Sequence, residues 1–215
     1  MNMKRVAAAS SLALLCGCGA LTPTVSQPPT LYSLAGAANA VTPASARPRL
    51  AAAGALTLAV SPPHAAAGYD SPRMMYLRQA NKLEYFAYNE WVDTPARMLA
   101  PLIVAALARD SAYRAVVQTP SIAEGDLRLD TEILRLQQEF LGKPSEVRFA
   151  LRAYIVDSAT RRVVASRDFE STAIAATDNP RGGVEAARLA VQNVLDDLSA
   201  FCAGATGSWK PSARR

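Results

Sequence analysis

Between residues 127 and 174, three runs of alternating apolar and polar side chains constrain the possible folds more than any other part of the sequence. The middle run places an apolar side chain at every second position: Val147, Phe149, Leu151, Ala153 and Ile155. A period of two is typical of a strand with one covered face. The connecting segments, 142–144 and 157–161, are short enough to join antiparallel neighbours. We therefore expect an antiparallel meander with one buried face.

The first of these runs changes phase in its middle. Leu127 and Leu129 alternate with charged residues, but beyond Ile133 the apolar positions shift to Leu134 and Leu136. A shift of one residue would turn every later side chain to the other face of the sheet, unless one extra residue is accommodated locally. The sequence therefore predicts a β-bulge close to Ile133.

A helix is predicted at about residues 95–109, where apolar side chains recur at intervals of three and four. Asp93 or Thr94 can cap its first turn, and Pro95 suits the first helical position. Pro101 lies inside the pattern, so we expect either a kink there or a later start of the helix.

A second helix is predicted from Val184 to Gly204, after a break at 179–183. Shorter strand candidates cover residues 31–34, 56–60, 74–77, 82–91 and 113–118. The sum is an α+β fold: one domain with an antiparallel or mixed sheet and two main helices packed on it. Asn179 to Gly183 also contains Arg181-Gly182-Gly183, which could bind an anion at the start of the helix, although a plain linker is the simpler interpretation.

Aromatic residues are concentrated between residues 69 and 91. In the strand candidate 82–91, Leu83, Tyr85 and Ala87 share one face, with Trp91 further along it, and the opposite face is mixed. Tyrosine and tryptophan are enriched at protein interfaces but are also common in strands. Both alternatives stay open for Tyr85 and Tyr88, whereas Trp91 is expected in the core. We name four tyrosines as possible partner-binding residues: Tyr69, Tyr76, Tyr85 and Tyr88.

The sequence offers few groups for catalysis. His64 is the only histidine, and neither a Gly-x-Ser-x-Gly elbow nor a phosphate-binding glycine loop occurs. The histidine and cysteine content does not provide a zinc site. Two carboxylate pairs, Asp168 with Glu170 and Asp196 with Asp197, are interpreted as solvated surface residues rather than an acid–base pair or a calcium site. We expect no catalytic residue, no metal and no cofactor.

The composition favours one folded domain without a nucleic-acid partner. Half of the residues are hydrophobic, which is typical of a globular chain rather than a disordered one. The net charge of +5 includes Lys4 and Arg5 near the start, and three cations close to the end, Lys210, Arg214 and Arg215. The body between them is close to neutral and lacks the basic face that nucleic acid would require.

The N-terminus has the pattern of a bacterial lipoprotein signal. Two basic residues precede a short apolar run, which is too short to span a bilayer. The run ends in Leu15-Cys16-Gly17-Cys18, which resembles a lipobox, and this resemblance implies acylation of Cys18 and cleavage before it. Cys16 is the rival anchor, but it is preceded by Leu15, where the lipobox has a small residue. A hydrophobic N-terminal helix is the remaining alternative.

The residues that follow agree with a lipid-anchored protein. Residues 19–30 hold Pro23, Pro28 and Pro29 among polar residues, which predicts a tether. Gly19 follows the anchor where Asp usually retains lipoproteins at the inner membrane, so the resemblance implies the outer membrane. Cys202 is the one cysteine left beyond the anchor, and its position on an apolar helical face predicts burial.

The ordered set of motifs is similar to one known family, the PqiC-like ABC-type transport auxiliary lipoproteins. The lipobox and tether lead into Leu31-Tyr32-Ser33-Leu34, and further motifs follow in order: Tyr69-Asp70, Ser71 to Tyr76, Asn81 to Tyr85, Asn89-Glu90-Trp91 and Pro95. The resemblance covers nearly the whole mature chain and is sharpest from Tyr69 to Arg109. It divides the chain into a signal peptide (1–17), an acylated tether (18–30), the auxiliary domain (31–203) and a flexible tail (204–215).

The resemblance implies a non-enzymatic component of a lipid transport system that maintains the cell envelope. Its expected partners are an ABC ATPase, a permease and a mammalian-cell-entry (MCE) domain protein, with a homo-oligomer as a further possibility. The expected location is the periplasmic face of the outer membrane, held by acyl chains on Cys18. Two alternatives stay open: an outer-membrane assembly lipoprotein, which would serve lipopolysaccharide or β-barrel assembly, and a lipid-modified hydrolase.

Overall fold

The computed structural model describes residues 27–35, 55–109, 112–121 and 123–210. Within these ranges, nine strands and two helices follow one another along the chain. The strands are β1 (Thr30–Tyr32), β2 (Leu56–Val60), β3 (His64–Ala65), β4 (Arg73–Gln79), β5 (Lys82–Trp91), β6 (Tyr113–Gln118), β7 (Leu127–Glu139), β8 (Glu146–Asp157) and β9 (Val163–Ile174). The helices are α2 (Pro95–Ala108) and α3 (Pro180–Ser208). The signal peptide, Cys18 and residues 19–26 of the predicted tether lie outside the described residues.

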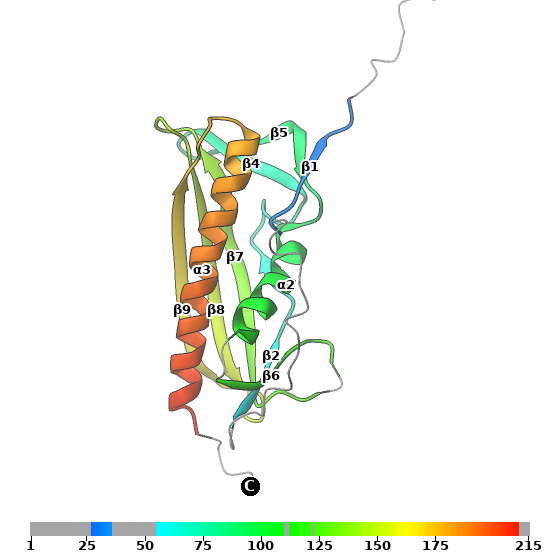
Figure 1. The fold of residues 1–215 in the computed structure, drawn as a ribbon, viewed down its shortest axis with the longest axis vertical. Coiled ribbons are helices and arrows are strands. Elements are labelled where there is room, and N and C mark those ends of the chain that lie inside the picture. Colours follow the sequence, from blue (N-terminus) through cyan, green and yellow to red (C-terminus); the bar gives the residue numbers. More distant parts are fainter. Residues whose placement is uncertain (1–26, 36–54, 110–111, 122, 211–215) are drawn as a thin grey trace, which may run out of the picture.

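Strand β7 organises the sheet (Figure 1). One of its edges pairs with β8 over the full length in antiparallel register, and β8 pairs with β9 in the same way, which confirms the predicted meander. The other edge pairs in parallel with three separate strands: β2 at its start, β3 in its middle and β4 at its end. β6 then extends β2, while β5 and β1 extend β4. The sheet is therefore mixed.

The predicted bulge lies where the phase changes, because the pairing of β7 with β8 shifts between Ile133 and Arg135. Before it, Leu129 and Ile133 are buried on the helix side of the sheet. After it, Leu136 and Gln138 take over that side, and Gln138 contacts the residues that precede α3. One extra residue thus keeps apolar side chains in the core along the whole strand.

Helix α2 begins at Pro95, with Thr94 as its N-cap. The Thr94 hydroxyl accepts a hydrogen bond from the Arg97 backbone N–H at 3.4 Å. The alternative of a start beyond Pro101 is wrong, since that proline lies inside the helix with its side chain exposed. The buried positions of α2 include Met98, Leu99 and Ile103, which confirms the predicted apolar stripe.

Helix α3 begins earlier than expected, at Pro180. Asn179 is the N-cap, and its side-chain oxygen accepts a hydrogen bond from the Gly182 N–H at 2.9 Å. The break predicted at 179–183 is therefore the first helical turn. Two glycines occur there because other segments of the same chain lie close to this turn. A Cβ on Gly182 would collide with Thr177, and one on Gly183 would collide with the Gln138 side chain.

Helix α3 also ends later than predicted, at Ser208 rather than Gly204. The Thr206 hydroxyl donates to the Ala203 carbonyl at 3.1 Å, which satisfies part of the last turn. Beyond the helix, Trp209 Nε1 donates to the Asp157 carboxylate at 3.2 Å. This contact fastens the end of the helix to the β8–β9 turn, so residues 204–208 are helical rather than part of a loose tail. Residues 211–215 lie outside the described residues.

The core lies between the two helices and the sheet face that they cover. Cys202 belongs to this core, as predicted, and burial raises the pKa of its thiol to about 12. Among the described residues, no helix combines the length and the hydrophobicity that a membrane span requires.

Candidate interaction surface

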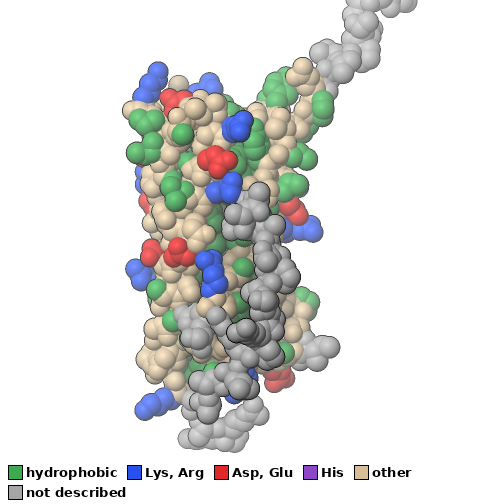
Figure 2. Space-filling model, viewed as in Figure 1, with side chains coloured by type: hydrophobic (Ala, Val, Ile, Leu, Met, Phe, Trp, Pro, Cys, Tyr) green, Lys and Arg blue, Asp and Glu red, His purple; other side chains and the backbone are tan. Residues whose placement is uncertain are grey.

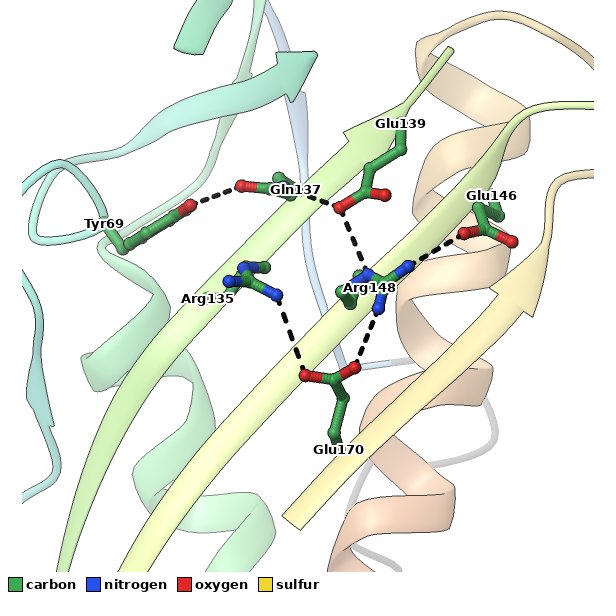
Figure 3. Close-up of polar contacts among 7 residues, drawn as sticks. All are labelled: Tyr69, Arg135, Gln137, Glu139, Glu146, Arg148 and Glu170. Carbon is green, nitrogen blue, oxygen red and sulfur yellow. Dashed lines mark hydrogen bonds and ion pairs between the residues drawn. The ribbon is translucent and has the colours of Figure 1, made fainter. Parts of the chain in front are cut away.

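The sheet face opposite the helices is the candidate surface, and we call it the open face. Parallel pairing of β4 with β7 places Met75 and Leu77 on the same face as Gln137 and Glu139. In Figure 3 these β7 side chains lie in front of the sheet, and α3 passes behind it. No helix in the described ranges covers this face. Its β4–β5 part is apolar, and its β7–β9 part is ionic.

The apolar part is carried by the β4–β5 hairpin. Met75 pairs with Tyr85 and Leu77 with Leu83, so these four side chains share the open face. Leu83 and Tyr85 are exposed. The face that the sequence marks as apolar in β5 is thus turned outward, while Phe86, on the other side of the strand, packs against the core.

The sequence periodicity predicted that Trp91 shares a face with Leu83 and Tyr85. This prediction is wrong. The register of β4 and β5 shifts between Met75, which pairs with Tyr85, and Arg73, which pairs with Glu90. The extra residues of β5 in this bulge reverse the inward and outward positions beyond it. Trp91 is therefore buried, which confirms its expected place in the core.

The four predicted tyrosines do not form one site. Tyr85 and Tyr88 are 50% and 60% exposed, and the Arg73 guanidinium carbon lies 4.3 Å from the centre of the Tyr85 ring. Tyr76 belongs to an internal aromatic cluster, with ring centres 4.5 Å from Phe86 and 5.9 Å from Phe140. Of these four tyrosines, only Tyr85 and Tyr88 offer a ring to a partner.

Tyr69 has a structural role. Its hydroxyl donates a hydrogen bond to the Gln137 side-chain oxygen (Figure 3). Burial raises the pKa of this hydroxyl above its ordinary value, so it stays protonated and remains a donor. Tyr69 lies in the β3–β4 loop, where Gly68 is close to Leu83 of the open face, since a Cβ on Gly68 would lie 3.4 Å from the Leu83 side chain. The hydrogen bond therefore holds this loop against the open face.

The ionic part of the open face is centred on Arg148. Its guanidinium donates to Glu139 at 3.2 Å, to Glu146 at 3.2 Å and to Glu170 at 2.8 Å (Figure 3). Arg135 lies 3.7 Å from the second oxygen of Glu170. Three strands thus contribute to one cluster, which the sequence analysis missed. The sequence signal was the row of charged residues at the outward positions of β7, β8 and β9.

Glu139 is the member of the cluster that depends most on its partners, because its side chain is almost buried. It accepts from Gln137 Nε2 at 2.7 Å as well as from Arg148. An almost buried carboxylate without such donors would be costly, whereas exposed pairs contribute about 1 kcal/mol or less. The cluster therefore fixes Glu139, Gln137 and, through Gln137, the Tyr69 loop.

The two carboxylate pairs have structural explanations. Asp168 forms a two-point contact with Arg152 across β8 and β9, at 2.7 and 2.8 Å, and this contact lowers the pKa of the carboxyl. Its sequence neighbour Glu170 is held by Arg148. Asp196 and Asp197 are exposed on α3. In the described ranges, no group of three His, Cys, Asp or Glu side chains is arranged to hold a metal ion.

A cleft of about 580 Å³ lies beside the start of β7, between the β6–β7 loop and the β8–β9 turn. Two of its three acidic side chains, Asp126 and Asp157, are already engaged, and the third, Glu124, is exposed. Asp126 accepts from the Thr57 N–H at 2.8 Å, and Asp157 accepts from Ala159, Thr160 and Trp209. These carboxylates hold loops in place and provide no acid–base pair. His64, in β3, is exposed and lies outside the lining of this cleft.

Comparison with solved structures shows the fold. A Xanthomonas campestris protein assigned to the DUF330 family model is 21% identical, with 86% of this chain and 91% of that chain covered and a TM-score of 0.64. A hypothetical protein of Chlamydia trachomatis is 9% identical, with 70% and 96% covered and a TM-score of 0.50. No curated protein sequence matches.

A comparison with family models is more specific. Residues 32–199 match the model described as the ABC-type transport auxiliary lipoprotein component. The match includes both parts of the open face and the part of α3 that precedes residue 200, and it confirms the resemblance drawn from the motifs between Leu31 and Pro95. The chain belongs to the ABC-type transport auxiliary lipoprotein family.

Proposed function

We propose that this protein is a non-catalytic, outer-membrane-anchored component of a lipid transport system that helps to maintain the cell envelope. Its periplasmic domain docks with an MCE-domain protein, which works with an ABC permease and ATPase. Acyl chains on Cys18 hold the domain at the membrane. The observation that carries this proposal is the family match over residues 32–199.

The chemistry of the described residues supports a docking role rather than catalysis. The carboxylates that pair with Arg148 and Arg152, and those of Asp126 and Asp157 that hold loops, are already engaged. The open face presents aromatic and aliphatic side chains instead. Exposed tyrosines in a well-ordered strand make good contact residues because they bury a large area at a low entropic cost. We therefore propose Tyr85 and Tyr88 as contacts for the MCE-domain partner. Tyr69 and Tyr76 support this surface from within.

Site-specific photo-crosslinking in cells tests the proposal. A photoreactive phenylalanine analogue replaces Tyr85 or Tyr88, and Leu189 is the matched control position. Leu189 is similarly exposed but lies on α3, on the other side of the sheet. We expect positions 85 and 88 to crosslink to an MCE-domain protein and position 189 not to do so.

The identity of the crosslinked protein decides between the alternatives. An outer-membrane β-barrel protein attached at positions 85 and 88 would favour the assembly role instead. If no MCE-domain protein is attached at either position, while the variants are expressed at the parent level, the proposed docking is wrong.

A further inference from the structure

Several strand ends meet at one end of the molecule. Glu139 pairs with Glu146, and Glu146 pairs with Ile174, so the last residue of β7, the first of β8 and the last of β9 lie side by side. Leu77 of β4 pairs with Glu139, which brings the β4–β5 turn to the same end. β1, where the described chain begins, is also at this end in Figure 1.

The exposed side chains at this end combine apolar and basic character, and we call them the strand-tip surface. Leu141 and Ile174 are 55% and 69% exposed, and Leu83, which pairs with Leu77 on the far side of β4, is 39% exposed at the same end of the sheet. Exposed cations come from both turns and from the start of α3: Arg78, Lys82, Lys143 and Arg181. Basic and apolar side chains are visible at the upper end in Figure 2.

The acidic groups at the strand-tip surface do not cancel this charge. Glu84 pairs with Lys82 at 3.2 Å, and Glu146 pairs with Arg148 at 3.2 Å. Asp178 accepts a hydrogen bond from the Ser145 N–H at 2.7 Å and has Lys143 nearby. Arg148 also pairs with the almost buried Glu139 at 3.2 Å. Five cations at this end (Arg78, Lys82, Lys143, Arg148 and Arg181) therefore face four acids (Glu84, Glu139, Glu146 and Asp178), which leaves a small positive excess. Aliphatic side chains surrounded by excess cations are typical of surfaces that lie in the headgroup region of anionic membranes.

We propose that the strand-tip surface rests on the bilayer that holds the acyl chains, so that the long axis of the sheet stands away from the membrane. This inference rests on the proposed acylation of Cys18. Residues 19–29 separate that anchor from β1, and a tether of this length, as the sequence predicts, has an average end-to-end distance of about 20 Å. The 13 residues of β7 span about 40 Å, so the opposite end lies beyond that average reach.

The opposite end of the sheet provides a matched control, because its side chains are similar. Val163, at the start of β9, is 58% exposed, and Arg161 and Arg162 precede it. If side-chain chemistry alone decided, both ends would bind lipid. The short connection from Cys18 raises the effective concentration of bilayer at the strand-tip surface more than at the opposite end.

Lipid quenching on the full-length acylated protein tests this orientation. Leu141→Cys and Val163→Cys are each labelled with a fluorophore, while buried Cys202 stays unlabelled and the anchor cysteine is acylated. The labelled proteins are reconstituted into vesicles of phosphatidylethanolamine and phosphatidylglycerol that contain brominated lipid. We expect brominated lipid to quench most of the fluorescence of the label at 141 and to leave the fluorescence of the label at 163 unchanged.

Charge variants and intact mass complete the test. In the anchored protein, Lys143→Glu should lower the ratio of domains that rest on the bilayer to domains that do not, read as quenched against unquenched label at 141. We expect a decrease of at least about fivefold, because each cation near an anionic surface changes such a ratio by about that factor. Intact mass reports acylation separately. An acylated protein with equal quenching at 141 and 163, or with none at either, overturns the orientation while the anchor stands. A protein that is not acylated at Cys18 overturns both.

Discussion

At the scale of single residues, Gly183 is constrained most tightly by its surroundings. Any Cβ at this position would overlap the end of the Gln138 side chain, which is itself buried and tied to Ser145 Oγ at 2.9 Å. Because Gln138 would have to shift and give up its hydrogen bond to Ser145, Gly183→Ala should lower the free energy of unfolding by about 2 kcal/mol. Urea denaturation, followed by circular dichroism, measures this loss.

A second glycine of the same helix supplies the control. Gly204 has open space where a Cβ would lie, and it sits four residues before the helix end. Gly204→Ala should therefore raise the free energy of unfolding by up to about 1 kcal/mol, the usual gain for Gly→Ala inside a helix. If both substitutions changed stability in the same direction, the packing assigned to Gly183 and Gln138 would be wrong.

Thr131 has a buried hydroxyl without a hydrogen-bond partner in the described residues. It lies on the core side of β7, between Leu129 and Ile133. Thr131→Val replaces the hydroxyl by a methyl group of similar size and should raise the free energy of unfolding by about 1 kcal/mol. Thr131→Ser keeps the hydroxyl and should lower it. Thermal unfolding of both variants checks the two signs, and a destabilising valine would mean that the hydroxyl has a partner.

At the scale of elements, the β8–β9 turn and the end of α3 stabilise each other through Asp157. The Thr160 and Ala159 N–H groups and the Trp209 indole donate to this carboxylate and hold its pKa below the ordinary value. A depressed pKa in the folded state adds stability above the unfolded pKa of about 3.9, and this stability disappears as the pH falls through the folded value. Asp157→Asn should therefore be less stable than the parent at pH 7, and the gap should close towards pH 2.

Denaturation curves at several pH values measure this gap. Trp209→Phe is the matched variant, because it removes the indole donor and leaves both backbone donors in place. It should lose less stability than Asp157→Asn at pH 7. A gap between Asp157→Asn and the parent that is constant with pH would contradict the role assigned to the carboxylate.

The elements that the sequence predicts well are those defined by local periodicity. The β7–β9 meander, the bulge near Ile133 and the stripe of α2 all follow from the spacing of apolar residues along one segment. The ends of α3 were placed wrongly because they depend on distant partners. Gln138, on β7, requires Gly183 in the first turn, and Asp157, at the end of β8, holds Trp209 after the last turn.

The pairing of β7 with three different strands, and the interaction surface, could not be read from local patterns. Parallel partners from separate parts of the chain leave no mark in the periodicity of any one of them. The outward direction of Tyr85 depends on the register of β4 against β7, and the Arg148 cluster depends on three strands at once. Tyrosine occurs both on covered and on exposed strand faces. The residue type alone therefore could not decide whether Tyr85 and Tyr88 lie in an interface or in the core.

At the scale of the whole molecule, each structural layer has a different role. The helices and the covered face of the sheet form the core, and the open face remains available for contact. The Arg148 cluster and the Tyr69 hydrogen bond keep that open face ordered without the help of a helix. A surface that is ordered before it binds loses little entropy on binding, which suits a component that docks with a partner.

The proposed anchor would decide whether this surface meets the proposed partner, and Cys18→Ser tests it. Because acylation of Cys18 is expected to precede cleavage, the variant should keep residues 1–17 and appear as the heavier, unprocessed form. Its domain should fold as in the parent, since the core is built from residues between Leu34 and Cys202, but it should leave the outer-membrane fraction. Intact mass and sucrose-gradient fractionation measure the two effects. Cys16→Ser, which changes the rival position, should be processed and located like the parent. The opposite result, with Cys16→Ser unprocessed and Cys18→Ser normal, would move the anchor to Cys16.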